Sequence, residues 1–300
     1  MNERALRVDG LRVRCLEQGR GAAVLLLHGA SLGSSADVWA RNLAPLAAHG
    51  LRVIAPDLPG FGHTDNPADH SLGYRQRFVP MLLDALELER AALVGHSQAG
   101  RIAVELAFST PERVAKVVVL ATGSLLPPLE GAAAEGDEGT AAEPTLAETR
   151  ALLEANLYNK ALATDEAVAS RHRMSVGKNF QAFVARQQAK GGGKGAVPLW
   201  QRLAQCPVPL LMLYGEHDRG EAARRVARAR ELYPQLDLRL LPRAAHLAQW
   251  DAAAAFADIA GRFLGKSLQR VPHKRRFKFG PWHAVHARRV RAFAAAVCAG

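Results

Sequence analysis

The feature that most constrains the fold of this 300-residue chain is a short apolar run that stops at a glycine and passes directly into a helical pattern. Residues 91–94 (AALV) have the composition of a buried strand, and residues 95–100 (GHSQAG) carry Ser97 between small neighbours. This strand–turn–helix pattern is typical of a G-x-S-x-G elbow, in which a strained turn raises a serine hydroxyl above the sheet edge. Alanine replaces the last glycine of the pattern at Ala99, and Gly100 follows. On these residues alone, a Gly/Ser turn that merely precedes a helix is an equal alternative.

Strand-like and helix-like segments alternate along most of the chain. The first segment alternates apolar and polar residues around Asp9-Gly10, which predicts a β-hairpin. Apolar runs typical of strands buried on both faces occupy residues 22–27, 51–57, 91–94, 117–120, 209–214 and 238–241. Helical patterns occupy residues 37–49, 75–88, 98–108, 222–232 and 251–264. This alternation predicts an α/β protein with a mostly parallel central sheet flanked by helices.

The alternation stops between residues 124 and 205, where no segment has a strand pattern. Three helices are expected there: one begins at a Thr145/Glu148 capping box, one follows Thr164, and one carries Phe180 and Phe183 on one face. Glycine-rich stretches at residues 131–139 and 191–195 predict loops. The sequence therefore divides into a core of residues 1–123 and 206–265, an inserted helical cap of residues 124–205, and a tail of residues 266–300.

Composition and charge limit the class of protein and the cellular compartment that we expect. An apolar content of 49% can fill a large core, and three cysteines without ligand-like spacing argue against a disulfide framework or a zinc site. No signal-like start and no membrane-length apolar run are present, so we expect a soluble cytoplasmic protein. Nine of the 39 basic residues lie in the tail, which has no acid, leaving 30 basic against 28 acidic residues elsewhere. We interpret the tail as solvated and disordered, with binding to nucleic acid or an anionic membrane as the alternative.

Three reactive side chains follow the ends of predicted strands in the order Ser97, Asp218, His246. A serine hydroxyl needs a base to accept its proton, and a histidine imidazole titrates in the range that suits this task. A buried carboxylate then holds the imidazole tautomer and stabilises its cation. The order and placement are far more specific than the serine turn alone and indicate a catalytic triad. Glu216 is a weaker alternative for the acid, because it precedes the turn that ends the strand.

Residues 5–265 resemble the α/β-hydrolase fold family with a helical cap. The resemblance is carried by LHG at residues 27–29, DLPGFG at 57–62, GHS at 95–97, GEHD at 215–218 and His246. Within that family the chain is most similar to the meta-cleavage-product hydrolases, which cleave carbon–carbon bonds in ring-fission products of aromatic catabolism. This likeness rests on HLAQWD at residues 246–251, on Thr164-Asp165 with Arg171, and on WARN at residues 39–42. The elbow and the loop after His28 depart from that group, which usually has GNSMGG and a Gly-Pro-Gly loop.

The resemblance implies roles for further residues. The oxyanion hole would use the backbone N–H groups of Gln98 and of Ala30 or Ser31. Arg171 would bind a substrate carboxylate through its guanidinium fork, and Trp250 would contact the substrate. A solvated arginine and a packing tryptophan are the alternative interpretations.

Three functions are compatible with these residues. The resemblance implies a hydrolase that cleaves a C–C bond in a carboxylate-bearing ring-fission product, after its histidine has promoted a dienol-to-ketone shift. A carboxylesterase or lactonase acting through an acyl-enzyme is the alternative, and a non-catalytic binding protein is a third. We expect a small-molecule substrate and no cofactor, metal, specific nucleic acid or membrane partner, while a homo-oligomer stays open. His28 and His96 are expected to shape the site and not to transfer protons.

Overall fold

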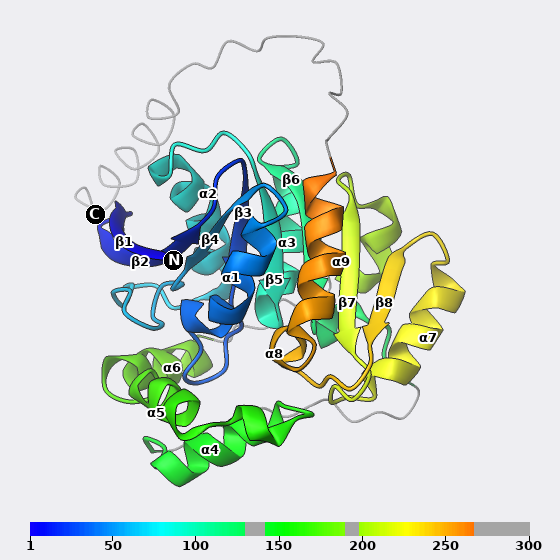
Figure 1. Cartoon of the computed structure of the whole chain (residues 1–300). Coiled ribbons are helices and arrows are strands. Elements are labelled where there is room, and N and C mark those ends of the chain that lie inside the picture. Colours follow the sequence, from blue (N-terminus) through cyan, green and yellow to red (C-terminus); the bar gives the residue numbers. More distant parts are fainter. Residues whose placement is uncertain (130–141, 190–197, 267–300) are drawn as a thin grey trace, which may run out of the picture. The chain divides into compact units, whose positions relative to one another are not determined.

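The computed structural model describes residues 1–129, 142–189 and 198–266, and its strands form one 8-stranded sheet (Figure 1). The strands are β1 (Asn2–Val8), β2 (Leu11–Gln18), β3 (Ala22–Leu27), β4 (Leu51–Pro56), β5 (Ala91–His96), β6 (Val114–Leu120), β7 (Leu210–Gly215) and β8 (Asp237–Leu241). Their order is β1-β2-β4-β3-β5-β6-β7-β8. The pairs β1–β2 and β2–β4 are antiparallel and the remaining pairs are parallel, so the predicted mostly parallel sheet is confirmed.

The predicted hairpin is also present. Asp9 and Gly10 join β1 to β2 with positive φ angles of 48° and 79°. A turn with two positive φ angles matches the right-handed twist of the strands that it connects. The hairpin forms one edge of the sheet and leaves the parallel strands β3, β5, β6 and β7 in its centre.

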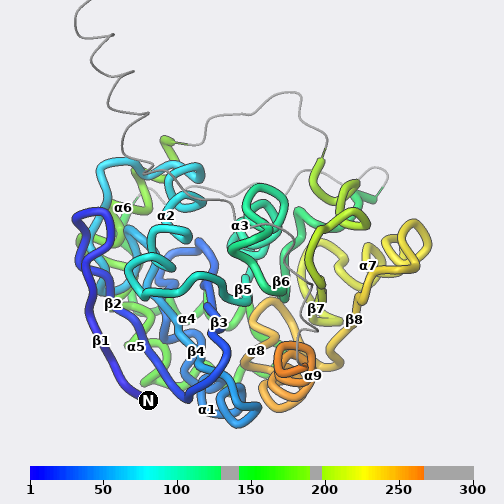
Figure 2. The backbone as a smooth tube through the Cα atoms, turned by 90° about the horizontal axis from the view of Figure 1, so that it is seen from above, coloured from blue at the N-terminus to red at the C-terminus, as the bar shows by residue number. Residues whose placement is uncertain are grey.

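Helices cover both faces of the sheet, and its central strands therefore bury side chains on both sides. Leu25 of β3 packs in the cluster that contains Phe78, whereas its neighbour Val24 packs in the cluster that contains Trp39. Figure 2 shows α2 (Leu72–Ala85) and α3 (Gln98–Ser109) on one side of the sheet, with α1 (Ala40–Ala47) and α9 (Ala253–Gly265) on the other. The remaining core helices are η1 (Ala36–Trp39), η2 (Gly123–Leu125), η4 (Leu199–Gln205), α7 (Ala222–Leu232) and α8 (Ala248–Asp251).

Some helix boundaries differ from those predicted. The helix α2 begins three residues earlier than expected, because the Ser71 hydroxyl accepts a 3.1 Å hydrogen bond from the Tyr74 N–H and caps it. The helix predicted at residues 37–49 is a 3-10 turn, η1, followed by α1. The last predicted helix is divided at Ala252 into α8 and α9.

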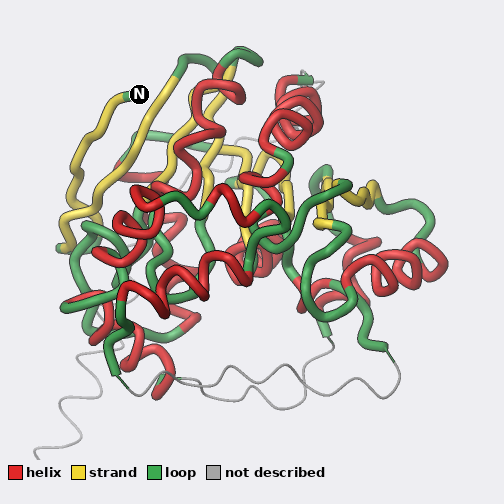
Figure 3. The backbone as a smooth tube through the Cα atoms, turned by 60° about the horizontal axis from the view of Figure 1, so that its bottom comes forward, coloured by secondary structure: helices red, strands yellow, loops and turns green. Residues whose placement is uncertain are grey.

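The described part of the insertion is helical and lies across the carboxyl ends of the parallel strands (Figure 3). It consists of α4 (Leu146–Ala155), η3 (Lys160–Leu162), α5 (Asp165–Arg173) and α6 (Lys178–Gln188). Thr145 and Glu148 form the predicted capping box, and the Thr164 hydroxyl caps α5 by accepting from the Ala167 N–H. Leu153 packs in the same cluster as Trp39, so the insertion is anchored on the core.

Some predictions concern residues or properties beyond the described ranges. The loops predicted at residues 131–139 and 191–195, and the tail beyond Lys266, lie outside the described residues. The cap boundaries at residues 124 and 205, the cytoplasmic location and the homo-oligomer stay predictions. Among the described helices, none combines the length and hydropathy needed to cross a bilayer.

Candidate functional site

Ser97 occupies a sharp turn between β5 and α3, as the sequence predicts. Its φ and ψ angles are 54° and −126°, a backbone conformation that costs free energy for a residue other than glycine. The Ser97 N–H donates to the Leu120 carbonyl of β6 at 2.8 Å and fixes the turn against the neighbouring strand. Strain held in place by surrounding structure is typical of functional sites.

The glycines beside Ser97 explain why Ala99 is tolerated in the elbow. A β-carbon on Gly95 would collide with the Ala99 carbonyl oxygen, and a β-carbon on Gly100 would collide with the Thr122 hydroxyl. Ala99 itself is buried and is not among the residues with positive φ. The close approach of helix and strand therefore depends on Gly95 and Gly100, and the change from glycine to alanine has no geometric consequence.

The loops after β7 and β8 bring Asp218 and His246 together. The Nδ1 atom of His246 lies 2.9 Å from Oδ1 of Asp218, whose side chain is 5% exposed. The Arg219 N–H donates to the same oxygen at 2.8 Å. With Nδ1–H donating to a carboxylate, Nε2 of the neutral ring is left as the proton acceptor. Glu216 is exposed, and no hydrogen bond found in the described part of the chain joins its carboxylate to His246.

His96 supports the loop that carries His246. Its Nε2–H donates to the His246 carbonyl oxygen at 2.9 Å, and the two rings lie 4.9 Å apart. Burial, with a smaller contribution from His246, holds the pKa of His96 well below its ordinary value, so the ring is neutral. His96 directly precedes Ser97, and this hydrogen bond therefore holds His246 next to the elbow. The structural role expected for His96 agrees with these contacts.

His28 shapes the loop that follows β3. Its Nε2 accepts a 2.9 Å hydrogen bond from the Leu58 N–H, so Nδ1 carries the proton and donates to the Gly29 carbonyl at 2.7 Å. Burial lowers the pKa of His28 to about 4 and keeps the ring neutral. A β-carbon built on Gly29 would lie 3.1 Å from the Ser97 β-carbon, which shows how closely this loop approaches the elbow.

The residues expected to form the oxyanion hole lie beside Ser97. Ala30 and Gln98 line one cavity of about 420 Å³. Ser31 lies next in the loop, where its hydroxyl is 3.0 Å from that of Ser34. The two loops that would supply the backbone donors therefore meet at a common space.

Arg171 reaches this loop from the cap. Its guanidinium donates to the Ser31 hydroxyl at 3.0 Å and to the Leu32 carbonyl at 2.8 Å. Within the part of the chain that the structure describes, its Nε is buried without a hydrogen-bond partner. Burial, assisted by the charge of Arg219, lowers the pKa of Arg171 to about 10. No ion pair among the described residues includes Arg171. With respect to the described residues, the side chain is therefore a cation without a counter-charge at the edge of the site.

Trp250 packs against the start of the first long helix. Its indole N–H donates to the Val38 carbonyl at 2.7 Å, and the Arg41 guanidinium lies 5.2 Å from the centre of its ring. These contacts give Trp250 a packing role. Contact with a substrate stays a prediction.

Asp251 is a residue to which the sequence analysis assigns no role. Its Oδ2 accepts hydrogen bonds from the Tyr158 and Ala245 N–H groups at 3.0 and 2.9 Å, and its Oδ1 accepts one from the Asn159 N–H at 3.0 Å. Tyr158 and Asn159 belong to the link between α4 and α5, whereas Ala245 directly precedes His246. One carboxylate therefore ties the cap to the histidine loop. No local sequence pattern indicates this contact.

No cluster of three or more His, Cys, Asp or Glu side chains in the described ranges is arranged to hold a metal ion.

The sheet order, the strained Ser97 turn and the Asp218–His246 pair together define the class of protein. The profile of the alpha/beta hydrolase fold family matches residues 22–253, and the chain belongs to this family.

Individual relatives in this family indicate which hydrolases the chain resembles. The chain is 31% identical over 279 residues to a 2-hydroxy-6-oxo-6-phenylhexa-2,4-dienoate hydrolase from Burkholderia cepacia, covering 88% of this chain and 94% of the relative. A 2-hydroxy-6-oxononadienedioate/2-hydroxy-6-oxononatrienedioate hydrolase from Cupriavidus pinatubonensis is 30% identical over 267 residues, with coverage of 85% and 91%. A solved meta-cleavage product hydrolase from Pseudomonas fluorescens IP01 superimposes with a TM-score of 0.72 at 26% identity, covering 87% of this chain and 96% of that one. The chain is therefore an α/β hydrolase related to the meta-cleavage C–C hydrolases.

Proposed function

We propose that this chain is a hydrolase in which Ser97, His246 and Asp218 act as a catalytic triad. The observation that carries the proposal is the 2.9 Å hydrogen bond between Asp218 and His246, on a loop held beside the strained Ser97 turn. Nε2 of His246 would accept the proton of the Ser97 hydroxyl or of an attacking water. Asp218 would keep the proton on Nδ1 and stabilise the imidazolium that forms.

The reaction we propose is hydrolysis of a C–C bond in a carboxylate-bearing ring-fission product. Relatives at 30–31% identity are named as hydrolases of such dienoates and dienedioates. The backbone N–H groups of Gln98 and of Ala30 or Ser31 would stabilise the negative charge on the attacked carbonyl oxygen. Water supplies the oxygen of the new carboxylate, the C–C bond breaks, and His246 returns a proton to the departing carbon.

The cap contributes Arg171 to this proposal. A guanidinium that lies over the oxyanion loop without a carboxylate partner in the described part of the chain suits a substrate carboxylate. The name of one relative specifies a substrate with a single carboxylate, and that of another specifies a substrate with two. The proposal for Arg171 therefore requires one carboxylate on the substrate and does not fix whether there is a second.

A carboxylesterase or lactonase is the second candidate. The same triad and oxyanion donors would serve it, with an alkoxide as the leaving group. The observation that favours it is that Arg171 already donates to Ser31 and Leu32, which is also what a purely structural arginine would do.

One assay panel separates these two functions. We expect kcat/KM for a ring-fission dienoate to exceed that for short aryl esters, and the reverse order would establish the esterase. Ser97→Ala should lower turnover of both substrate types by at least about 10⁴-fold while leaving the circular dichroism spectrum unchanged. Ser109→Ala, at the exposed far end of the same helix, is the matched control and should retain full activity. Full activity in the Ser97→Ala protein would refute the triad.

A further inference from the structure

The cavity that Ala30 and Gln98 line, Gln98 being next to Ser97 in the chain, is also bordered by two helices. Besides Ala30 and Gln98, its walls include the first residues of α2 and the last turns of α6. Two arginines line it, Arg75 from α2 and Arg186 from α6. These side chains are only 6% and 7% exposed.

Both arginines are buried without a counter-charge among the described residues. Arg75 donates to the Gln98 side-chain oxygen at 2.5 Å, and its Nε is buried with no hydrogen-bond partner in the described ranges. Arg186 donates to the Gly60 carbonyl at 2.8 Å and lies 3.7 Å from the centre of the Phe61 ring. No carboxylate in the described part of the chain forms an ion pair with either. Burial of a charge is costly when no opposite charge accompanies it.

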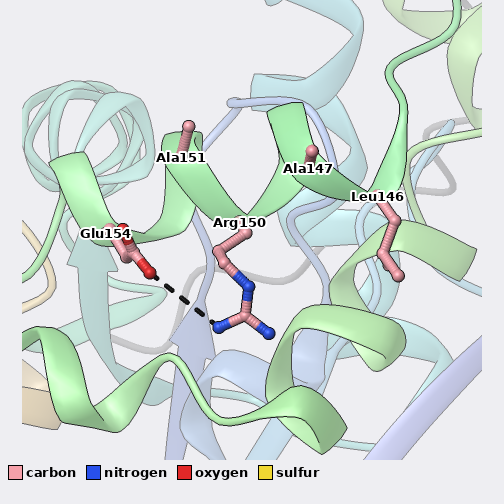
Figure 4. Close-up of a pocket in the computed structure, with 5 residues that line it drawn as sticks. All are labelled: Leu146, Ala147, Arg150, Ala151 and Glu154. Carbon is pink, nitrogen blue, oxygen red and sulfur yellow. Dashed lines mark ion pairs between the residues drawn. The ribbon is translucent and has the colours of Figure 1, made fainter.

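Two partly buried arginines elsewhere in the chain provide a contrast, because each has acidic partners. Arg14 pairs with Glu3, Asp37 and Asp57. A second hollow, on the surface of α4, is lined by Arg150, which pairs with Glu154 at 3.8 Å (Figure 4). Arg150 also pairs with Asp165. The hollow on α4 is therefore already neutralised, whereas the described residues that line the cavity beside Ser97 include two cations and no acid.

The start of a helix adds to the positive potential of the same cavity. Ser71, Leu72 and Gly73 at the N-terminus of the 14-residue helix α2 line it, and the positive end of a helix favours anions. Burial and the charges of the two arginines lower the pKa of His70, which directly precedes Ser71, and so favour its neutral ring; its Nδ1 is buried without a hydrogen-bond partner among the described residues. Burial likewise lowers the pKa of Arg75 to about 10, and burial together with the charge of Arg75 lowers that of Arg186 to about 9.

We propose that Arg75 and Arg186 bind a second carboxylate of the substrate, so that the preferred substrates are dicarboxylates. This inference rests on the proposed function, in which Arg171 takes the first carboxylate. Arg171 contacts Ser31 and Leu32, whereas Arg75 and Arg186 share the cavity with Ala30 and Gln98. The site at Arg171 and the site at Arg75 and Arg186 therefore border the oxyanion region through different residues. A substrate with an acid group on each side of its reacting carbonyl would engage both sites.

Gln98 connects the second site to the reaction. Its backbone N–H is a candidate oxyanion donor, and its side-chain oxygen holds Arg75. Arg75 and Arg186 are thus specificity-determining residues, and their loss should affect the choice between diacid and monoacid more than the rate on a monoacid.

The first test measures binding without turnover. Glutarate, its monomethyl ester and inorganic phosphate are titrated calorimetrically into the full-length Ser97→Ala protein. Glutarate should bind at least about tenfold more tightly than its monoester, because a hydrogen bond to a charged group is worth that factor or more. Arg75→Gln and Arg186→Gln should each remove the difference. Arg77→Gln, which removes an exposed cation of the same helix that pairs with Asp69, should preserve it.

Several outcomes would overturn the second carboxylate site. These are equal affinity for glutarate and its monoester, a preference that survives both Gln substitutions, and tighter binding of phosphate than of glutarate. Arg75→Lys and Arg186→Lys replace the Gln variants if the latter do not fold. They keep the charge but not the guanidinium fork, and should still lower the preference severalfold.

The second test compares turnover of a diacid ring-fission product and its distal methyl ester. The wild-type protein should prefer the diacid in kcat/KM, and either Gln variant should bring the ratio to about one. An equal loss on both substrates would mean a structural role for the arginines and would overturn the inference. If neither substrate is turned over but glutarate binding depends on Arg75 and Arg186, the proposed function fails and the site stands. If both are turned over without preference, the function stands and the site fails.

Discussion

Replacing Asp251 with alanine should loosen the cap and the histidine loop together. The carboxylate accepts three backbone hydrogen bonds, two from the α4–α5 link at Tyr158 and Asn159 and one from Ala245 beside His246. Alanine would leave all three N–H groups without their acceptor. The segments that the carboxylate joins are far apart in the sequence, so no neighbouring residue of the same helix can replace it.

The expected magnitude follows from these three bonds. Each hydrogen bond to a charged group contributes about 1.5–3 kcal/mol when it is well shielded. Asp251 is only half-buried, and water can satisfy part of the freed N–H groups, so we expect a total loss of about 2–3 kcal/mol. For a domain of this size that corresponds to a Tm lower by about 5 °C. Asp251→Asn should cost less, since an amide oxygen in the place of Oδ2 keeps the bonds from Tyr158 and Ala245.

Thermal unfolding and steady-state kinetics together test this prediction. Because Ala245 positions His246, Asp251→Ala should also lower kcat/KM by about tenfold or more. Asp258→Ala is the control, since Asp258 is an exposed residue of α9 that forms an i,i+4 pair with Arg262. Its free energy of unfolding should change by less than about 0.5 kcal/mol. An Asp251→Ala protein with the Tm and kcat/KM of the wild type would refute the reasoning.

Arg171→Ala should lower kcat/KM for acidic substrates by about tenfold or more and for neutral esters by less than about threefold, because only the acids lose a charge-assisted pair. Arg171→Lys should not restore the loss, and equal losses on both substrate types would leave Arg171 only its structural contacts with the oxyanion loop. Truncation after Gly265 should leave kcat/KM within about threefold of the full-length value, and a larger loss in steady-state kinetics would show that the tail contributes to the active enzyme. Burial lowers the pKa of His28 from 6.5 to about 4, so the unfolded chain binds this proton first as the pH falls. This contribution to the free energy of unfolding is present above pH 6.5 and is lost on acidification through pH 4. His28→Gln should flatten the dependence of the free energy of unfolding on pH over that interval, as measured by denaturant titrations. An unchanged dependence on pH would contradict the assignment.

Most regular elements can be predicted from the sequence because their signals are local. A central parallel strand such as β3 needs consecutive apolar residues, since both of its faces are covered. The starts of α4 and α5 follow from Thr145 and Thr164, whose hydroxyl groups cap the helices as predicted. The start of α2 is harder to predict, because Ser71 ends a polar stretch that is equally typical of a loop.

The candidate site likewise contains some residues that can be predicted from the sequence and others that cannot. Ser97, Asp218 and His246 can be found from the sequence, because each follows the end of a strand. Arg75 and Arg77 look alike in the sequence, two residues apart on one helix. In the structure Arg75 is 6% exposed and lacks an acidic partner in the described ranges, whereas the side chain of Arg77 is 65% exposed and pairs with Asp69. The difference depends on which elements pack against each face of α2, and no local pattern contains that information.

The link between α4 and α5 connects the cap to the loops that carry Asp218 and His246 of the proposed triad. The Leu247 N–H donates to the Asn156 carbonyl at 2.9 Å, next to the bonds that Asp251 makes with Tyr158 and Asn159. The ring of Tyr158 also stacks on His217 at 4.6 Å, directly before Asp218. A displacement of this link would therefore disturb the Asp218–His246 pair from both sides.

The arginines of the cap reach the site by a different route. Arg171 on α5 contacts the loop after β3, and Arg186 on α6 contacts Gly60, but neither makes a hydrogen bond to the histidine loop in the described part of the chain. Under the proposed function, recognition of substrate acid groups and alignment of His246 would therefore depend on different segments of the same insertion. Substitutions at Arg171 or Arg186 can change which acids bind while the proton acceptor stays in place, whereas substitutions in the α4–α5 link should lower the rate for every substrate.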